Sequence, residues 1–530
     1  RHVWLNIRNN VHLPGGGVFI STDISKGRGK RAEIASRAEV KSEISVANSG
    51  LEDASVRVKS IVTDRSGKVI AQAISGKMQS KARQRPIVIP AKTGSSQPPM
   101  ATFTHKIKTP RLWSLEDPYL YRITHIVLVK GKEVDRLTTK FGIRDIEIDP
   151  DKGFFLNGKH IKIQGTNNHQ DHAGVGSALP DYLQYYRIQH LKNFGVNAYR
   201  ASHNPPTPEL LEACDSLGML VMDETRLMNT SPEYMDQFDR LILRDRNHPS
   251  IFMWCIGNEE QDIQTNSHGK RIALTMMQRL KQLDPTRTCT YAADLENYFP
   301  GINEVIPVRG FNYRHYARAD YHRDHPDQAV IGTEMGSTVT TRGIYEIDSV
   351  RAYLPDQDLN APWWASLAEA WWPETAENDW DLGGFIWTGF DYRGEPTPFK
   401  WPNISSHFGI LDVCGFPKNV AYYYKSWWSK EDVLHISPHW NWPDKEGEMI
   451  KVWVNSNADE VELFLNGHSF GKKTMPCNSH LNWDVVYEPG TLEAIGWRDG
   501  REIRAKVETT GPAVNVACLV HKTTMVADGQ

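Results

Sequence analysis

The pattern of hydrophobic and polar positions changes twice along the chain. From about residue 18 to 147, short segments alternate apolar and polar residues, as in 38–46 (AEVKSEISV), and turn signals such as Asn48-Ser49-Gly50 separate them. An alternation with period two is typical of strands that bury one face. Many short strands at this spacing predict an antiparallel sandwich of immunoglobulin type over residues 18–147.

The same alternation returns from about residue 432 to the end of the chain. Val461, Leu463 and Leu465 point to one face, and the pairs Asn466-Gly467 and Asp499-Gly500 supply tight hairpin turns. We therefore predict a second immunoglobulin-like sandwich over residues 432–530.

Between the sandwiches, apolar strands alternate with helices. One helix shows as a stripe of Ile272, Met276, Leu280 and Leu283, and Thr207-Pro208 has the residue types that begin another. Eight segments have strand character: 160–164, 196–201, 219–224, 251–259, 288–294, 308–313, 329–334 and 382–390. Eight strand–helix repeats predict a (β/α)8 TIM barrel over residues 148–431.

Two of the predicted barrel strands end in a carboxylic acid. The apolar run Ile251–Ile256 leads through Gly257 and Asn258 to Glu259, and Val330–Thr333 leads to Glu334. The carboxyl ends of barrel strands form the active-site face, so we expect the two acids to face each other across its mouth. Paired carboxylates are what glycoside hydrolysis requires. Each acid alone could equally be a partner in a structural salt bridge.

Composition narrows the possible partners. The chain has 530 residues, a net charge of −3 and a pI of about 6.7, so nothing favours nucleic acid. No apolar run is long enough to span a membrane. The six cysteines form neither a zinc pattern nor a dense disulfide framework. The compartment is left open, with the periplasm or secretion as the expectation for a bacterial source.

Taken together, the chain resembles glycoside hydrolase family 2, the group of β-galactosidases, β-glucuronidases and β-mannosidases. The resemblance covers nearly the whole chain. Its motifs are 165–169 (GTNNH), 200–205 (RASHNP), 245–250 (DRNHPS), 257–259 (GNE) and Thr333-Glu334, and the segment 389–398 (GFDYRGEPTP) is most similar to the β-galactosidase branch.

The resemblance implies a retaining, exo-acting β-glycosidase that removes terminal β-D-galactosyl residues by double displacement. Glu259 would be the acid/base and Glu334 the nucleophile, with Arg200 and Tyr313 supplying charge and hydrogen bonds. Asn258 would bind the sugar 2-hydroxyl. His169 and His203 would bind other hydroxyls, and Trp387 would stack under the sugar. The alternative to each of these substrate-binding roles is a purely structural one.

Further residues are open to two interpretations. Asp223 and Glu224 end the third predicted strand and would either orient site residues or pair with cations. The tryptophan pairs 363–364 and 371–372 would either line a subsite or pack against the barrel.

The sequence departs from the family in one respect. Some family β-galactosidases hold Mg²⁺ through a Glu and a His after the third strand, but 223–228 reads DETRLM. We therefore expect no catalytic metal and no cofactor. The Asn-x-Lys signature of family glucuronidases is not evident either.

Other functions remain as alternatives. β-Glucuronidase, β-galacturonidase and β-mannosidase belong to the same family, and Arg393 is a residue that could hold a uronate. A TIM-barrel metallohydrolase would use the run 169–172 (HQDH) with His203 as ligands, since imidazole and carboxylate suit a metal. A binding protein with an inactive barrel is a third possibility, although both acids are present.

Residues 1–17 are expected to be the end of an N-terminal jelly-roll sugar-binding domain and a linker. Arg1–Ile7 (RHVWLNI) has the pattern of a strand, and the glycine-rich 14–17 follows it. An isolated strand has unpaired edges and an exposed Trp4, which favours pairing with another chain. Homo-oligomers are therefore also an expectation.

Overall fold

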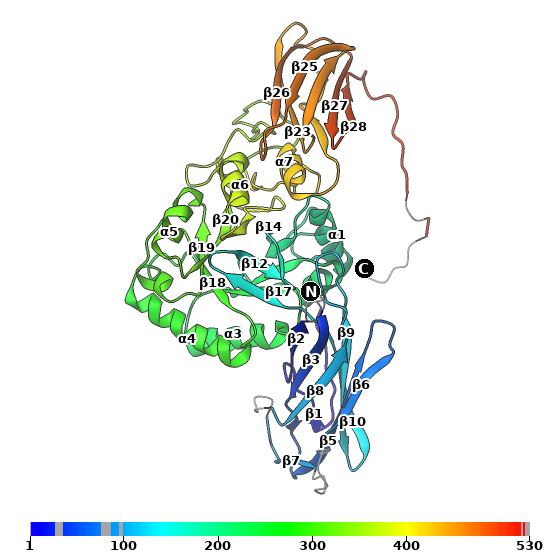
Figure 1. Ribbon diagram of the computed structural model, residues 1–530, viewed down its shortest axis with the longest axis vertical. Helices are drawn as coiled ribbons and strands as arrows, with labels where there is room; N and C mark the ends of the chain where they lie inside the picture. Colours follow the sequence, from blue (N-terminus) through cyan, green and yellow to red (C-terminus); the bar gives the residue numbers. More distant parts are fainter. Residues whose placement is uncertain (1, 27–34, 76–85, 95–98, 521–522, 525–530) are drawn as a thin grey trace.

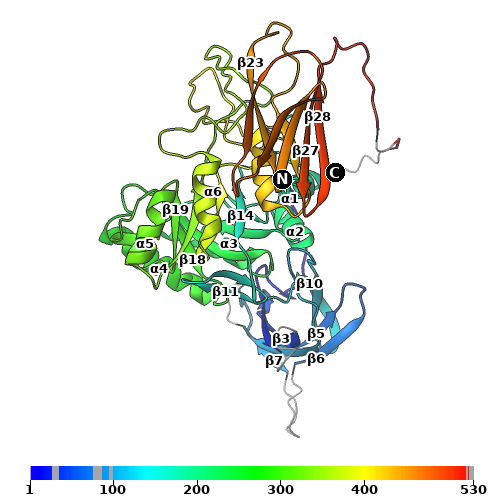
Figure 2. The same ribbon diagram turned by 45° about the horizontal axis from the view of Figure 1, so that its top comes forward.

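The computed structural model describes residues 2–26, 35–75, 86–94, 99–520 and 523–524. A β-sandwich, an eight-stranded barrel and a second β-sandwich follow one another along the long axis of the molecule (Figures 1 and 2). The predicted fold class, a TIM barrel between β-sandwich domains, is confirmed. None of the described helices is long and apolar enough to cross a membrane.

The first sandwich consists of two antiparallel sheets that share one core. One sheet has the order β2 (Val18–Lys26), β3 (Ala35–Ile44) and β8 (Ala101–Lys108). The other has the order β10 (Lys132–Phe141), β9 (Tyr121–Val129), β5 (Ala54–Thr63) and β6 (Val69–Ile74), with β7 (Ile87–Ile89) also paired to β5. Val40 from the first sheet and Val62 and Ile123 from the second are fully buried in this core.

The central domain is a closed barrel of eight parallel strands in sequence order. They are β14 (Ile163–Asn167), β15 (Ala198–Arg200), β16 (Leu220–Glu224), β17 (Ile251–Asn258), β18 (Cys289–Ala293), β19 (Val308–Asn312), β20 (Ala329–Met335) and β21 (Asp381–Ile386). Residues such as Met222, Met253 and Ile331 fill the interior, and all three are completely buried.

For two barrel strands, the predicted boundaries differ by three residues or more from the observed ones. The first barrel strand begins at Ile163 rather than His160, because Lys159–His160 (β13) pairs with β12 (Gly153–Leu156) in a small sheet with β11 (Ile146–Asp149). Phe154 of this sheet packs into the barrel core and closes its amino-terminal end. The eighth strand ends at Ile386, so residues 387–390 belong to the loop above the barrel.

Seven α-helices occur within the described ranges, and all but the last lie between barrel strands. They are α1 (Asp181–Lys192), α2 (Pro208–Leu217), α3 (Pro232–Asp245), α4 (Ser267–Leu283), α5 (Arg318–Asp324), α6 (Ala368–Glu377) and α7 (Asn419–Trp428). The predicted stripe on α4 is confirmed, since Met276, Leu280 and Leu283 are buried. The Thr207 hydroxyl caps α2 by accepting a hydrogen bond from the Leu210 amide.

The second sandwich pairs one three-stranded and one four-stranded sheet. The first has the order β22 (Leu434–Ser437), β23 (Met449–Ser456) and β26 (Leu481–Val486). The second has the order β25 (His468–Thr474), β24 (Glu460–Leu465), β27 (Thr491–Arg498) and β28 (Arg501–Glu508). At the predicted turn 466–467 both φ angles are positive, 51° and 82°, as a two-residue I′ hairpin requires.

The prediction of a strand at Arg1–Ile7 is wrong for residues 2–7, while Arg1 lies outside the described residues. Residues 2–7 pair with no strand in the part of the chain that the structure describes, and Trp4 is 74% exposed. Further along, β1 (Val11–His12) pairs with β4 (Ala47–Asn48), so part of the predicted linker is joined to the first sandwich. The jelly-roll origin of this segment and the exact domain boundaries stay predictions.

Candidate active site

A ring of polar side chains lies at the carboxyl end of the barrel. Six strands each end in, or next to, one of its members: Asn167 (β14), Arg200 (β15), Glu224 (β16), Asn258 (β17), Asn312 (β19) and Glu334 (β20). Glu259 follows β17, Tyr313 follows β19 and Trp387 follows β21. The barrel topology therefore brings to one face every residue that the sequence analysis proposed for the site.

Glu334 is held between hydrogen-bond donors and positive charge. Arg200 Nη1 donates to Glu334 Oε1 at 2.8 Å, and the Tyr313 hydroxyl donates to Oε2. The Glu334 side chain is only 3% exposed, so few water molecules reach it. A carboxylate in such surroundings is stabilised in its charged form by the donors and the guanidinium.

Glu259 lies in a different environment. Asn312 Nδ2 donates a hydrogen bond to Glu259 Oε1 at 2.7 Å. Burial, and next the negative charge of Glu334, raise the pKa of Glu259 to about 8. At neutral pH this carboxyl group therefore holds its proton. The backbone of Glu259 is in the left-handed region at φ 56°, an uncommon conformation for a residue with a side chain.

Arg200 connects most of the ring. Besides Glu334, its guanidinium donates to Asn167 Oδ1 at 2.9 Å and to Asn258 Oδ1 at 2.8 Å, and lies 2.6 Å from Glu224 Oε2. The side chain is completely buried. One cation on β15 thus fixes two carboxylates and two amides that come from four other strands.

Glu224 joins this network, while Asp223 does not. Glu224 accepts from His203 Nδ1 at 2.8 Å, and His203 Nε2 lies 3.7 Å from Glu334 Oε1. Burial works against the charge on Glu224, but Arg200 and His203 outweigh it and lower its pKa. Asp223 is also buried; burial and nearby Asp245 raise its pKa well above the usual range. Of the two acids, Glu224 is therefore the one that orients site residues.

Aromatic rings form one wall of the site. Trp387 stacks on His203 at 5.3 Å between ring centroids, with an interplanar angle of 18°. His169 lies edge-on to Trp387 at 5.4 Å and contacts Tyr392 at 4.2 Å. Burial lowers the pKa of His169 to about 4, so its ring is neutral near pH 7.

Sequence reasoning missed four members of the site. Asn167 and Asn312 each end a strand, which is the same signal that identified Glu334, but an amide has no evident chemistry of its own. Tyr392 and Glu395 lie in the loop after β21, where their hydrogen bond to each other could not be foreseen from spacing. Of the predicted tryptophans, Trp371 and Trp372 pack against the barrel, which confirms the structural reading for that pair.

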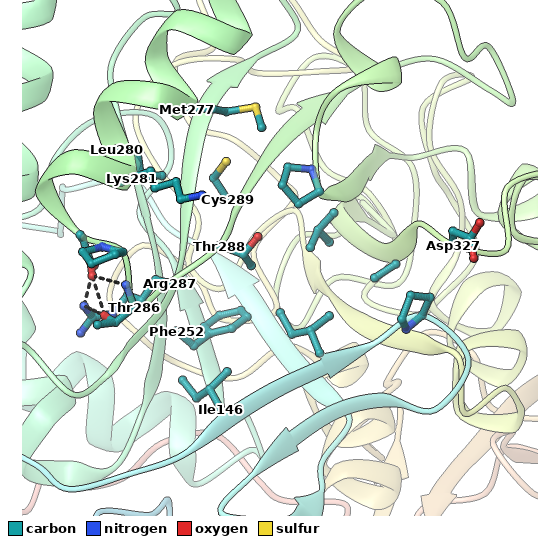
Figure 3. Close-up of a pocket in the computed structure, with 17 residues that line it drawn as sticks. Ile146, Phe252, Met277, Leu280, Lys281, Thr286, Arg287, Thr288, Cys289 and Asp327 are labelled. Carbon is teal, nitrogen blue, oxygen red and sulfur yellow. Dashed lines mark hydrogen bonds and ion pairs between the residues drawn. The ribbon is translucent and has the colours of Figure 1, made fainter. Parts of the chain in front are cut away.

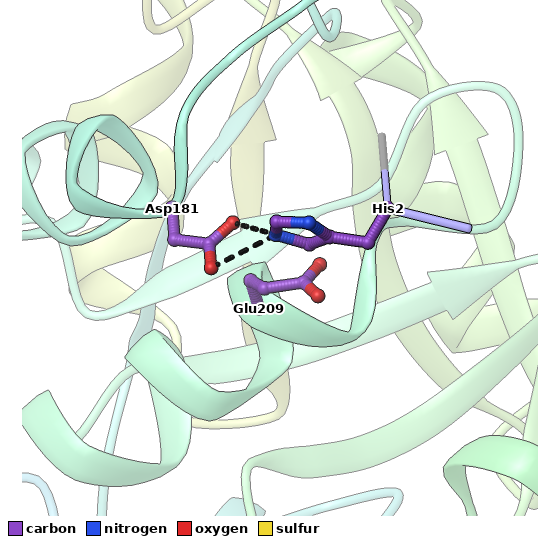
Figure 4. Close-up of side chains that lie close together, drawn as sticks. All are labelled: His2, Asp181 and Glu209. Carbon is purple, nitrogen blue, oxygen red and sulfur yellow. Dashed lines mark hydrogen bonds and ion pairs between the residues drawn. The ribbon is translucent and has the colours of Figure 1, made fainter. Parts of the chain in front are cut away.

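The metallohydrolase alternative has no geometric support. Among the described residues, only His2, Asp181 and Glu209 bring three candidate ligand atoms within 4.8 Å of one another (Figure 4). That group is at the surface, where His2 Nε2 is 2.9 Å from Asp181 Oδ1. It includes no residue of the run 169–172 and not His203.

A large cavity lies at the other end of the barrel. Its volume is about 610 Å³, and its walls come from β11, the amino ends of β17 and β19, and the end of α4 (Figure 3). Ile146, Phe252 and Leu280 give it a mainly apolar surface. Because the polar ring is at the opposite ends of the strands, this cavity is separate from the candidate active site.

The pKa of Glu259 should depend on the charge of Glu334. We expect Glu259 to titrate near pH 8, and its pKa to fall when Glu334→Gln removes the neighbouring charge. Carbon NMR of labelled glutamate side chains measures the pKa of Glu259 in the wild type and in Glu334→Gln. Because the folded-state pKa is raised, the stabilisation from protonated Glu259 is full below about pH 4.5 and is lost as the pH rises through about 8. An unchanged Glu259 pKa in Glu334→Gln would contradict the electrostatic coupling.

Comparison with known proteins agrees with this architecture. Residues 19–144 match the model for glycosyl hydrolases family 2, and residues 146–231 and 228–328 match its TIM barrel domain. Residues 447–504 match a domain of unknown function.

Relatives and solved structures carry two activity names. The β-galactosidase BoGH2A of Bacteroides ovatus is 32% identical over 100% of this chain and 67% of its own length. A putative β-glucuronidase of Formosa agariphila is 35% identical over 78% of this chain and 43% of its own length. A crystal structure of a β-glycosidase from Bacteroides vulgatus is 27% identical, covers 97% of this chain and 67% of that one, and has a TM-score of 0.82.

The chain therefore spans from under half to about two thirds of the length of these curated relatives. The match to the first relative, together with the barrel and sandwich models, identifies the family. This chain belongs to glycoside hydrolase family 2.

Proposed function

We propose that this chain is a retaining β-glycoside hydrolase in which Glu334 is the nucleophile and Glu259 the acid/base. The observation that carries the proposal is the contrast between the two carboxyl groups. Glu334 has a guanidinium and a tyrosine hydroxyl on its oxygens, while the pKa of Glu259 is raised to about 8. One acid is thus ready to attack and the other to give up a proton, the division of roles that a glycosidase needs.

The reaction would proceed in two displacements. Glu334 attacks the anomeric carbon as the bond to the leaving oxygen breaks, and that oxygen takes the proton of Glu259. The ester that forms has no charge on Glu334, so the repulsion that raised the pKa of Glu259 is removed. Glu259 then takes a proton from water, whose oxygen attacks the anomeric carbon and releases Glu334. Asn258, whose side-chain oxygen accepts from Arg200 and Asn312, would bind the sugar 2-hydroxyl.

We further propose a β-D-galactosyl residue as the sugar that is cleaved. The β-galactosidase relative and the segment 389–398 support this choice. Glu395 of that segment accepts a hydrogen bond from Tyr392, which contacts His169. Although Glu395 is an exposed residue, partial burial of its carboxyl group, and next the charge of Glu334, raise its pKa. A uronate would add another negative charge near Glu395, whose charged form is already disfavoured, so a neutral sugar fits better.

A β-glucuronide is the second candidate substrate. The Formosa agariphila relative bears that name, and Arg393 lies two residues before Glu395 with its side chain exposed. Arg393 is held by its backbone amide, which donates to Asp171 Oδ2 at 2.9 Å, so its guanidinium is the group that could meet a carboxylate.

Removing either carboxylate should abolish turnover without unfolding the chain. We expect Glu259→Gln and Glu334→Gln each to lower kcat for a nitrophenyl β-galactoside by roughly a thousandfold or more, with circular dichroism and Tm near wild type. Azide should partly restore turnover of Glu334→Ala on an activated galactoside and give α-galactosyl azide, because the small anion fills the vacated space. Near-native turnover by Glu334→Gln would disprove its role.

Stereochemistry is an independent measurement. We expect the β-anomer of the sugar as the first product, observed by proton NMR before mutarotation, and a separation of about 5–5.5 Å between the two carboxyl groups in a crystal structure. The α-anomer as first product, or a gap of about 9 Å, would instead indicate an inverting enzyme.

Substrate choice should respond to the charges of the loop 389–398. We expect a higher kcat/KM for nitrophenyl β-galactoside than for the glucuronide and mannoside. Glu395→Gln should lower the ratio of kcat/KM for the galactoside to kcat/KM for the glucuronide by roughly tenfold, about 1.4 kcal/mol. The reason is that it removes a negative charge that would repel the uronate. Arg393→Gln is the matched control and should leave that ratio unchanged. A selective loss of glucuronide turnover in Arg393→Gln, with glucuronide as the better wild-type substrate, would favour the second candidate.

A further inference from the structure

Two tryptophans at the carboxyl face of the barrel are almost fully exposed. Trp363 is 89% exposed and Trp401 is 83% exposed. Tryptophan has a large apolar surface and is highly buried on average in folded proteins. Two rings left in water at the same end of a barrel therefore require an explanation beyond packing.

Trp363 lies one residue from the wall of the candidate site. It belongs to the loop between β20 and α6, and the next residue, Trp364, packs edge-on against Tyr313 at 4.5 Å between ring centroids. Arg314 also donates to the Trp364 carbonyl, at 3.4 Å. Tyr313 in turn donates to Glu334, so Trp364 is joined to the catalytic residues through one intervening side chain. These contacts hold the loop at the mouth of the barrel, and the Trp363 ring extends from it into solvent.

Trp401 lies in a hairpin that belongs to the loop after β21. Arg393 bridges Ser405, and the Gly394 amide donates to the Ile404 carbonyl at 2.6 Å, which closes the base of this hairpin. Phe399, two residues before Trp401, packs against the aromatic cluster that contains Trp387 and Tyr392. The hairpin is thus anchored on the same aromatic wall that borders the site.

We propose that Trp363 and Trp401 form a stacking surface for a sugar unit on the leaving-group side of the scissile bond. This inference rests on the proposed glycosidase function. Aromatic rings bind the apolar face of a sugar, and these two are continuous with the site through Trp364 and Phe399. The sugar that is cleaved would lie deeper, beside the buried Trp387, so rings in solvent are suited to the part of the substrate that remains outside.

A hollow next to Trp401 supports a carbohydrate rather than an apolar protein partner. Its volume is about 460 Å³, and it lies between the same two loops. Its lining combines amide and hydroxyl groups and the Tyr353 ring with charged side chains. The amide and hydroxyl groups include Asn403, Ser405 and Thr341, and the charged residues are Arg342, Arg351, Asp391 and Asp412. Amide and hydroxyl groups around an aromatic face are the combination that recognises a hydroxyl-rich ligand of this size.

The surface predicts a dependence on the leaving group. Binding energy from parts of the substrate that do not react can be used in the transition state. We expect Trp363→Ala and Trp401→Ala each to lower kcat/KM for lactose at least fivefold, and to leave kcat/KM for β-galactosyl fluoride within twofold of wild type. Galactosyl fluoride has a single-atom leaving group and cannot reach the tryptophans. Trp363→Phe and Trp401→Phe should retain most of the activity on lactose.

A second measurement does not depend on turnover. In the Glu334→Gln variant, cellobiose should change the tryptophan fluorescence, and a titration of this change gives its Kd. Trp363→Ala or Trp401→Ala in that background should raise this Kd at least fivefold. Trp4→Ala is the matched control, because Trp4 is 74% exposed outside the two mouth loops, and should bind as Glu334→Gln alone does. If wild type hydrolyses no galactosyl fluoride, the proposed substrate is wrong, while this titration still tests the stacking surface.

Three results would overturn the proposal. The first is an equal loss of kcat/KM on lactose and galactosyl fluoride, which would indicate a disturbed catalytic site. The second is cellobiose binding that is absent, or present and unaffected by both alanine variants. The third is a dimer in size-exclusion chromatography that Trp363→Ala or Trp401→Ala converts to monomers, because the rings would then be an interface between copies of this chain.

Discussion

The buried guanidinium of Arg200 is the interaction on which the site depends. It is completely buried and contacts two carboxylates, Glu224 at 2.6 Å and Glu334 at 2.8 Å. Charges removed from water are tolerated only when they are paired, and loss of one partner from a buried pair costs about 3–5 kcal/mol. Because the partners end different strands, the demand for pairing also fixes the relative positions of β15, β16 and β20. The charge pairs of Arg200 thus determine both the electrostatics of the site and the geometry of the barrel mouth.

The position of Arg200 also gives the two candidate catalytic acids, Glu259 and Glu334, different electrostatic environments. Glu334 receives the guanidinium directly, whereas Glu259 has a neutral amide, Asn312, and the repulsion of Glu334. Burial alone would raise the pKa of any carboxyl group. The unequal distribution of donors decides which one keeps its proton. Asn312 in turn accepts from the Thr333 hydroxyl at 2.6 Å, so the strand that carries Glu334 also orients the partner of Glu259.

Sequence reasoning predicted the fold and the strand-end residues because both depend on local patterns. A buried strand followed by a polar residue identified Glu259 and Glu334, and the order of the strands in a closed barrel placed them on one face. It could not predict what depends on distant contacts. The sequence predicts a barrel strand over residues 160–164, yet His160 pairs with β12. Asn312 and Glu395 gain their roles only from neighbours far along the chain.

The loops above the barrel are held by a second buried cation, which decides how rigid the mouth is. Lys418 is 1% exposed, lies 2.7 Å from Asp391 Oδ2, and donates to the carbonyls of Thr340 and His407. These partners belong to both loops that carry the exposed tryptophans. Burial raises the pKa of Asp391 to about 6 even beside this lysine, so this carboxyl group is mostly ionised at neutral pH. Since a binding surface gains affinity when its groups need no ordering, loops fixed in this way can present exposed rings at little entropic cost.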